Sequence, residues 1–75
     1  MYTYIVMVNL GNFARAEVFE HRPTLEDLLF HFPSEYHADL REFDWPQSLP
    51  RIQRLWVKTI GNCQLTLLKN AVLTN

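Results

Sequence analysis

The clearest alternation of hydrophobic and polar positions lies between Arg54 and Lys69, where two runs rich in β-branched and apolar residues flank Gly61 and Asn62. A two-residue loop of this chemistry between strand-like runs predicts a β-hairpin. Pairing about this turn gives the hairpin two different faces. One face is uncharged, with Leu55, Val57, Thr59, Gln64, Thr66 and Leu68; the other carries Arg54, Trp56, Lys58, Leu65, Leu67 and Lys69.

A second hairpin is predicted near the N-terminus, again about a Gly-Asn pair, at positions 11 and 12. Residues 2–10 are strand-like throughout, and residues 13–21 alternate well enough for a return strand. One face would carry Thr3, Ile5, Met7, Asn9, Ala14, Ala16, Val18 and Glu20, and the other Tyr2, Tyr4, Val6, Val8, Leu10, Phe13, Arg15, Glu17, Phe19 and His21. The small alanine side chains predict that a helix packs close to the first face.

Between the hairpins, the segment after Pro23 has the pattern of a helix start. Thr24 can cap the first free N–H groups, and Asp27 stands at the reciprocal position of a capping box. Pro33 ends the helix at or just before the preceding residue. The stripe of this helix that faces the core is Leu25, Leu28, Leu29 and Phe32.

Residues 34–43 predict either a second helical piece or a loose turn. Ser34 can cap it, and Tyr36, Leu40 and Phe43 share a face, whereas the other positions are uniformly polar. Residues 44–50 contain two prolines and read as a loop, from which Trp45 either packs back or projects. After Lys69, the last residues extend the final strand or fray.

The predicted order ββα(α)ββ occupies residues 1–75 as a single domain, because a chain this short has no room for a second core. A four-stranded, mostly antiparallel sheet made of the two hairpins, with one or two helices on one face, is the economical α+β arrangement. Short helices cover only one side of such a sheet, yet both sides carry large apolar groups. The uncovered side therefore needs another subunit or a partner, and we expect a homodimer built on the sheet.

Composition supports this expectation, because a core of this size rarely contributes more than about 3–5 kcal/mol of net stability. Cys63 is the single cysteine, which excludes an internal disulfide. The N-terminus lacks the features of a secretory signal, and no apolar run approaches the roughly 18–20 residues that span a bilayer. We expect a soluble, cytoplasmic protein, of the compact and motif-poor kind that phages and mobile elements encode.

The four residues Arg54, Trp56, Lys58 and Lys69 define a basic-aromatic face on the C-terminal hairpin. An aromatic ring among cations suits single-stranded nucleic acid, because the ring stacks on a base and the cations take phosphate. The alternative places Trp56 in the core and the cations at the rim or beside acidic residues. The net charge of −1 and the lack of an RNP-type pattern favour the alternative.

Aromatic residues also gather on the first hairpin and in the loop that follows the helices: Tyr2, Tyr4, Phe13, Phe19 and Trp45. Residues of these types anchor protein interfaces. The competing interpretation is that they form the domain's own core, reached when the second helical segment folds over that face. The sequence leaves both interpretations open.

Catalytic and metal-binding signals are weak. The acidic residues Glu26, Asp27, Glu35, Asp39, Glu42 and Asp44 lack calcium-loop spacing, and a solvated helix face explains them. The histidines, at positions 21, 31 and 37, lack the spacing of a helical metal pair. A pairing of Cys63 with a histidine as nucleophile and base needs a proximity that sequence does not show. No catalytic residue, metal or cofactor is therefore expected.

No motif in the sequence names a function. We expect a small non-enzymatic binding or regulatory protein that acts through a protein–protein surface as a homodimer, with another protein as a further partner and no membrane contact. One alternative is a single-stranded nucleic-acid-binding protein that uses the basic-aromatic face. The other is a small enzyme or ligand-binding protein with its site at a subunit interface.

Overall fold

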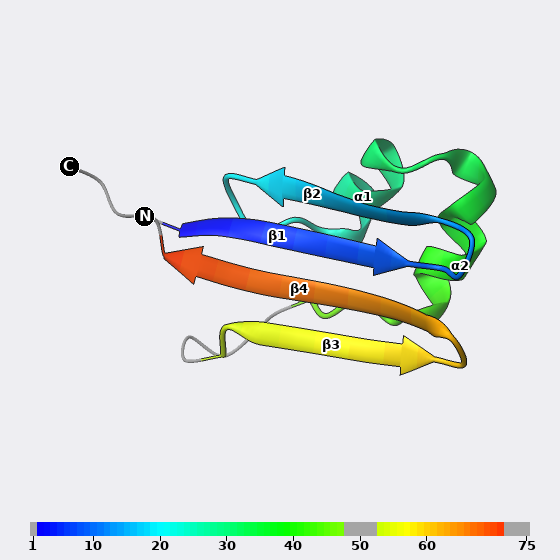
Figure 1. Ribbon diagram of the computed structural model, residues 1–75. Coiled ribbons are helices and arrows are strands. Elements are labelled where there is room, and N and C mark those ends of the chain that lie inside the picture. The colour runs from blue at the N-terminus through cyan, green and yellow to red at the C-terminus, as the bar shows by residue number, and fades with distance from the viewer. Residues whose placement is uncertain (1, 48–52, 72–75) are drawn as a thin grey trace.

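The computed structural model describes residues 2–47 and 53–71 and shows an antiparallel sheet with helices on one face (Figure 1). The predicted α+β architecture is confirmed, with four strands in the order β2-β1-β4-β3. The strands are β1 (Tyr2–Asn9), β2 (Ala14–Phe19), β3 (Leu55–Ile60) and β4 (Cys63–Ala71). The helical elements are α1 (Leu25–His31), the 3-10 turn η1 (Ser34–Tyr36) and α2 (His37–Glu42).

The first and last strands lie side by side at the centre of the sheet (Figure 1). Within each hairpin the register is the one that the Gly-Asn pairs predict, with Asn9 opposite Ala14 and Ile60 opposite Cys63. Both turn glycines adopt positive φ, +87° at Gly11 and +57° at Gly61, a backbone region that residues with a side chain rarely enter. Local turn chemistry therefore fixes each hairpin.

The start of α1 has the predicted capping box. The hydroxyl of Thr24 accepts a hydrogen bond from the backbone N–H of Asp27 at 3.2 Å, and the Asp27 carboxylate accepts one from the backbone N–H of Thr24 at 2.9 Å. The second bond, with the Thr24 hydroxyl and nearby His21 and His31 adding to it, lowers the pKa of Asp27 below its ordinary value of 3.8.

Thr24→Ala is expected to lower the free energy of unfolding by about 1 kcal/mol, because the Asp27 N–H loses its acceptor. The lowered folded-state pKa also means that Asp27 adds stability above pH 3.8, and that this contribution is lost as the pH falls through the folded-state value. Urea unfolding across acidic pH would show a flatter pH dependence for Asp27→Asn than for the wild type. Ser34→Ala is the control, since no cap bond is made at the start of η1.

The helices cover the sheet face that carries the large apolar side chains. Val6, Val8, Leu65 and Leu67 from the two central strands are buried there beneath Leu28, Phe32, Leu40 and Phe43. The prediction that a helix packs over Ala14 and Ala16 is wrong, since both alanines are exposed on the opposite face. The helices cover the face with the large side chains because that face offers far more apolar area for burial than the two alanine methyl groups.

Residues 34–43 form the predicted second helical piece, divided into η1 and α2. Leu40 and Phe43 enter the core, and the ring of Tyr36 stacks on Phe13 with 4.3 Å between centroids. The chain then leaves α2 through Asp44, which adopts φ +54°. This turn directs Trp45 back under the sheet. Residues 48–50 of the predicted loop lie outside the described residues.

Candidate interaction surface

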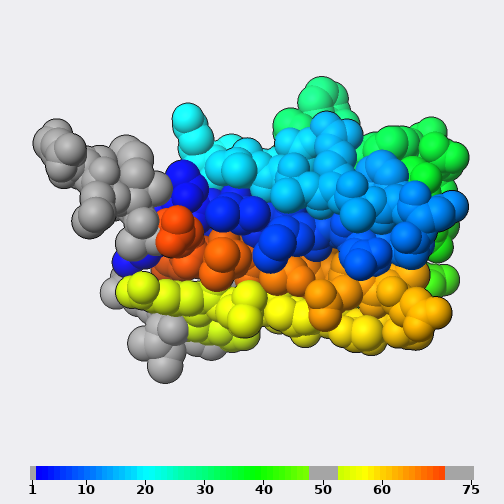
Figure 2. All heavy atoms as spheres, in the orientation of Figure 1, coloured from blue at the N-terminus to red at the C-terminus, as the bar shows by residue number. Residues whose placement is uncertain are grey.

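The sheet face turned away from the helices, called here the open face, has three rows that cross all four strands, and Thr3 lies opposite Asn70 beyond the first of them. Figure 2 views it directly, with the atoms of all four strands filling the surface and the green helices behind. The strand registers define the members of each row. The first row is Val18, Ile5, Leu68 and Leu55; the second is Ala16, Met7, Thr66 and Val57; the third is Ala14, Asn9, Gln64 and Thr59.

Apolar side chains dominate the first two rows and are accessible to solvent. The exposed fractions are 65% for Val18, 52% for Leu55, 44% for Val57 and 42% for Met7. Thr66 lies between two of these side chains and is only 6% exposed, although it belongs to the open face. The third row is polar, so the apolar character of the open face is concentrated toward the end where β2 finishes and β3 begins.

Charge is absent from all three rows. Exposed Glu20, just after β2, would continue the alternation beyond the first row. The charged residues of the strands, including Arg15, Glu17, Lys58 and Lys69, belong to the alternate positions that face the helical side. A sheet face that is exposed to water, apolar over two rows and uncharged is typical of a surface that is covered in the functional state.

A shallow hollow of about 430 Å³ lies on the β2 side of the open face. It is present because Ala14 and Ala16 are small beside Met7 and Gln64. The space that the sequence assigned to a helix is therefore left open for side chains from elsewhere. The open face therefore has a hollow on its β2 side and projecting apolar side chains on its β3 side.

The residues of the predicted basic-aromatic face are only partly free. Trp56 is half-buried against Trp45, with ring centroids 5.4 Å apart and planes at 73°. Lys69 Nζ lies 4.2 Å from the centroid of the Tyr2 ring, and its backbone N–H donates to the Arg54 carbonyl at 2.8 Å. Trp56 thus packs with the core, as the alternative interpretation had it, while Arg54 is exposed and Lys58 is half-buried.

The predicted aromatic interface is occupied by the chain itself. Phe19 is 8% exposed and Trp45 is buried, while Tyr4 and Phe13 pack against the core as partly buried residues. Only Tyr2 retains substantial exposure. Phe19 packs on His31 of α1, and Phe13 contacts both Phe32 at the end of α1 and Tyr36 of η1, so the first helix and the second helical segment cover this face together. Among the described residues, the open face is the larger apolar surface in contact with solvent.

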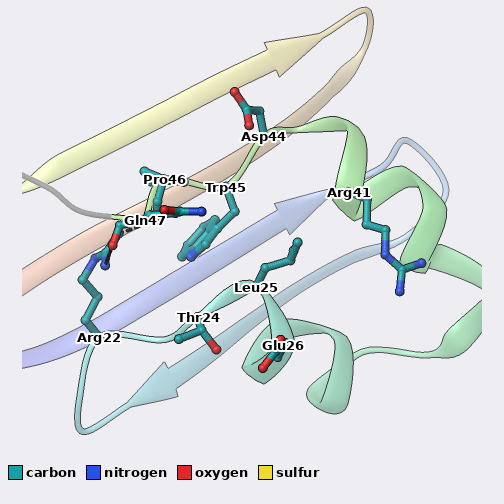
Figure 3. Close-up of a pocket in the computed structure, with 9 residues that line it drawn as sticks. All are labelled: Arg22, Thr24, Leu25, Glu26, Arg41, Asp44, Trp45, Pro46 and Gln47. Carbon is teal, nitrogen blue, oxygen red and sulfur yellow. Dashed lines mark hydrogen bonds between the residues drawn. The ribbon is translucent and has the colours of Figure 1, made fainter.

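A second hollow, of about 480 Å³, lies between the start of α1 and the segment that follows α2 (Figure 3). The Arg22 guanidinium reaches across it and donates to the carbonyls of Pro46 and Gln47, and Trp45 Nε1 donates to the Pro23 carbonyl at 3.0 Å. These bonds tie two segments together that are more than twenty residues apart in the chain. The Arg22 side chain therefore fixes the position of the loop after α2. No pattern in the sequence predicted this role.

The residues suggested for catalysis or metal binding are dispersed. Cys63 is half-buried beside its turn, the ring of His31 packs on Phe19 at 5.1 Å, and His37 Nε2 donates to the Phe32 carbonyl at 2.9 Å. Within residues 2–47 and 53–71, no group of three or more His, Cys, Asp or Glu side chains could hold a metal ion. In the same part of the chain, no helix has the length and apolar character needed to cross a bilayer.

Comparison of the chain with protein-family models, with curated proteins and with solved structures finds no match. Function is therefore inferred from the chain's own surfaces.

Proposed function

We propose that the protein is a small non-enzymatic binding protein that acts as a homodimer, in which the open faces of two copies pack against each other. The observation that carries this proposal is the pair of uncharged apolar rows, with Val18, Leu55, Val57 and Met7 each more than two fifths exposed. Burying such side chains against another apolar surface is favourable by about 25 cal/mol for each Å² removed from water.

A second copy suits this surface because a two-fold axis brings identical patches together. Near a two-fold axis, a charged side chain lies close to the same side chain of the other copy, and the two like charges repel each other. An uncharged face avoids this repulsion. The extent of the face sets the area that a dimer can bury. Four strands about 4.8 Å apart, each contributing about six residues at 3.3 Å, give a face of about 20 by 20 Å. Two such faces cover about 800 Å² in projection, and the relief of their side chains raises the accessible area toward the lower end of stable interfaces, about 1,200 Å² in total.

The distribution of side chains favours one orientation of the two copies. A two-fold axis parallel to the strands places each apolar row on its own counterpart and sets β2 of one copy over β3 of the other. Ala16, beside the hollow, then faces Val57 of the partner subunit, so a small residue meets a projecting one. An axis across the strands that passes through the second row would instead place the apolar first row on the polar third row. Aligned packing of this kind is usual where two sheets stack face to face.

The test is a matched pair of substitutions on the same strand and the same face. Val57→Lys places a charge in an apolar row and is expected to lower the mass measured by light scattering after size exclusion. Thr59→Lys adds the same charge to the polar row and should have a much smaller effect. Far-UV circular dichroism confirms that both variants are folded. A folded Val57→Lys variant with the wild-type mass, or a wild type that stays at the 8.9 kDa of a single chain at high concentration, would overturn the proposal.

A further inference from the structure

The outer edge of β2 presents unpaired backbone groups from small residues. β2 pairs with β1 on one side and with no described strand on the other. The hydrogen bond from the Leu10 N–H to the Phe13 carbonyl, 2.8 Å long, sets the alternation. Odd-numbered residues of β2 direct their backbone N–H and C=O groups toward β1. The outward-directed backbone groups therefore belong to Ala14, Ala16 and Val18.

We propose that β2 pairs antiparallel with β2 of a second copy, with Ala16 on the two-fold axis, so that two sheets join into one. In this register Ala16 lies opposite Ala16 of the partner subunit, and Ala14 lies opposite the partner's Val18. All three are outward-directed positions, so each opposed pair exchanges both of its backbone hydrogen bonds. The contact uses a different surface from the open-face dimer and goes beyond the proposed function.

Charge selects this register. Arg15 and Glu17 flank Ala16 and already form an ion pair within one chain, with the Arg15 side chain about half exposed. Pairing about Ala16 sets Arg15 opposite the partner's Glu17 and Glu17 opposite the partner's Arg15, which gives four charges of alternating sign. A shift of the register by two residues would instead oppose two arginines or two glutamates, which is unfavourable. Charged side chains that usually protect an edge strand here favour a second copy.

The other edge of the sheet is less suited to pairing with itself. The carbonyl of Leu55, which belongs to the outward-directed set on β3, already accepts a hydrogen bond from Gln53 Nε2 at 3.0 Å. Lys58 is the single charged residue of β3, so two copies of that strand cannot form reciprocal ion pairs. β2 is therefore the edge that the observations favour.

The surroundings of β2 supply further apolar surface. Phe30, at 86% the most exposed of the large hydrophobic side chains described, lies on α1, which runs behind β2 and projects past its edge (Figures 1 and 2). Because both copies carry α1 on the same face of the joined sheet, pairing brings a second α1 beside Phe30. Open-face packing sets β2 of one copy over β3 of the other, so the two free β2 edges of an open-face dimer lie at opposite ends. The two contacts together therefore predict an open-ended assembly of joined sheets whose mass grows with concentration.

The decisive test uses charge complementation between two variants. Arg15→Glu makes the edge wholly acidic and Glu17→Arg makes it wholly basic, so each variant alone is expected to lose edge pairing and to stop at the open-face dimer, below the wild-type mass at the same concentration. An equimolar mixture should recover the wild-type mass, because every acidic residue then faces a basic one. Loss of the intrachain ion pair would not be repaired by mixing, so mere destabilisation gives no recovery. A mixture that stays at the mass of a dimer overturns the proposal.

A double variant separates edge pairing from open-face packing, because the Arg15 side chain faces the helical side of the sheet and Val57 belongs to the open face. Arg15→Glu alone and Val57→Lys alone should each give dimers, and the double variant should give single chains of 8.9 kDa. A Val57→Lys variant that is already a single chain would refute edge pairing and leave open-face packing intact. An Arg15→Glu variant that is a single chain would refute open-face packing instead.

Discussion

Trp45→Ala is expected to abolish cooperative folding at room temperature. The buried indole packs edge-on against Trp56, with centroids 5.4 Å apart, and its Nε1 donates to the Pro23 carbonyl at 3.0 Å. Truncating a buried tryptophan costs about 3–5 kcal/mol. A single core of this size rarely supplies more than about 3–5 kcal/mol in total, so the loss is as large as the whole free energy of unfolding. Urea titration followed by far-UV circular dichroism would measure it.

Trp45→Phe provides the matched control for this substitution. It keeps an aromatic ring against Trp56 but removes the N–H that bonds the Pro23 carbonyl, so the expected loss is about 1–2 kcal/mol and the chain should still fold. The difference between the two variants measures the packing of the ring separately from the hydrogen bond. If Trp45→Ala unfolds with the wild-type midpoint and slope, the loop after α2 is not part of the cooperative core.

The elements that the sequence predicted correctly depend on contacts between near neighbours. Both hairpin registers follow from a Gly-Asn pair, and the start of α1 follows from Thr24 and Asp27 three residues apart. In these cases the residues that specify the structure lie within one turn of the chain. Local chemistry is enough to fix such features, whatever the rest of the fold does.

The relation between the hairpins could not be predicted in the same way. Nothing near Tyr2 or Lys69 in the sequence specifies that β1 and β4 pair, because the paired residues are 55 to 69 positions apart in the chain. That pairing aligns Ile5 with Leu68 and Met7 with Thr66, and so joins two uncharged hairpin faces into the open face. The uncharged face of each hairpin could be predicted from the alternation of residues alone. That the two faces lie side by side could be known only from the strand order.

The prediction of which sheet face the helices cover was wrong because it relied on small side chains. Ala14 and Ala16 suggested close helix approach, but the volume of apolar side chain on the other face of the same hairpin governs burial. Trp45 illustrates a different limit, since the sequence left it free either to pack or to project. Trp45 is buried because Asp44 adopts φ +54° and because the indole N–H bonds the Pro23 carbonyl, and both features arise only in the folded chain.

Phe19→Asp is expected to unfold the protein, whereas Val18→Asp should leave it folded and lower its mass in solution. The two residues are neighbours on β2 and point to opposite faces of the sheet, with exposed fractions of 8% and 65%. Asp at position 19 loses an aromatic ring from the core, which costs about 3–5 kcal/mol, and adds a carboxylate to an apolar environment. Asp at position 18 stays in water within one chain.

The same charge at adjacent positions thus separates folding from association. Val18 belongs to the first apolar row, so a carboxylate there would have to be buried when two open faces meet. Far-UV circular dichroism reports the fold of each variant, and light scattering reports its mass. If Phe19→Asp folds and Val18→Asp does not, the helices would have to cover the open face, and the assignment of core and surface would be reversed. If both fold and Val18→Asp keeps the wild-type mass, the first row takes no part in association.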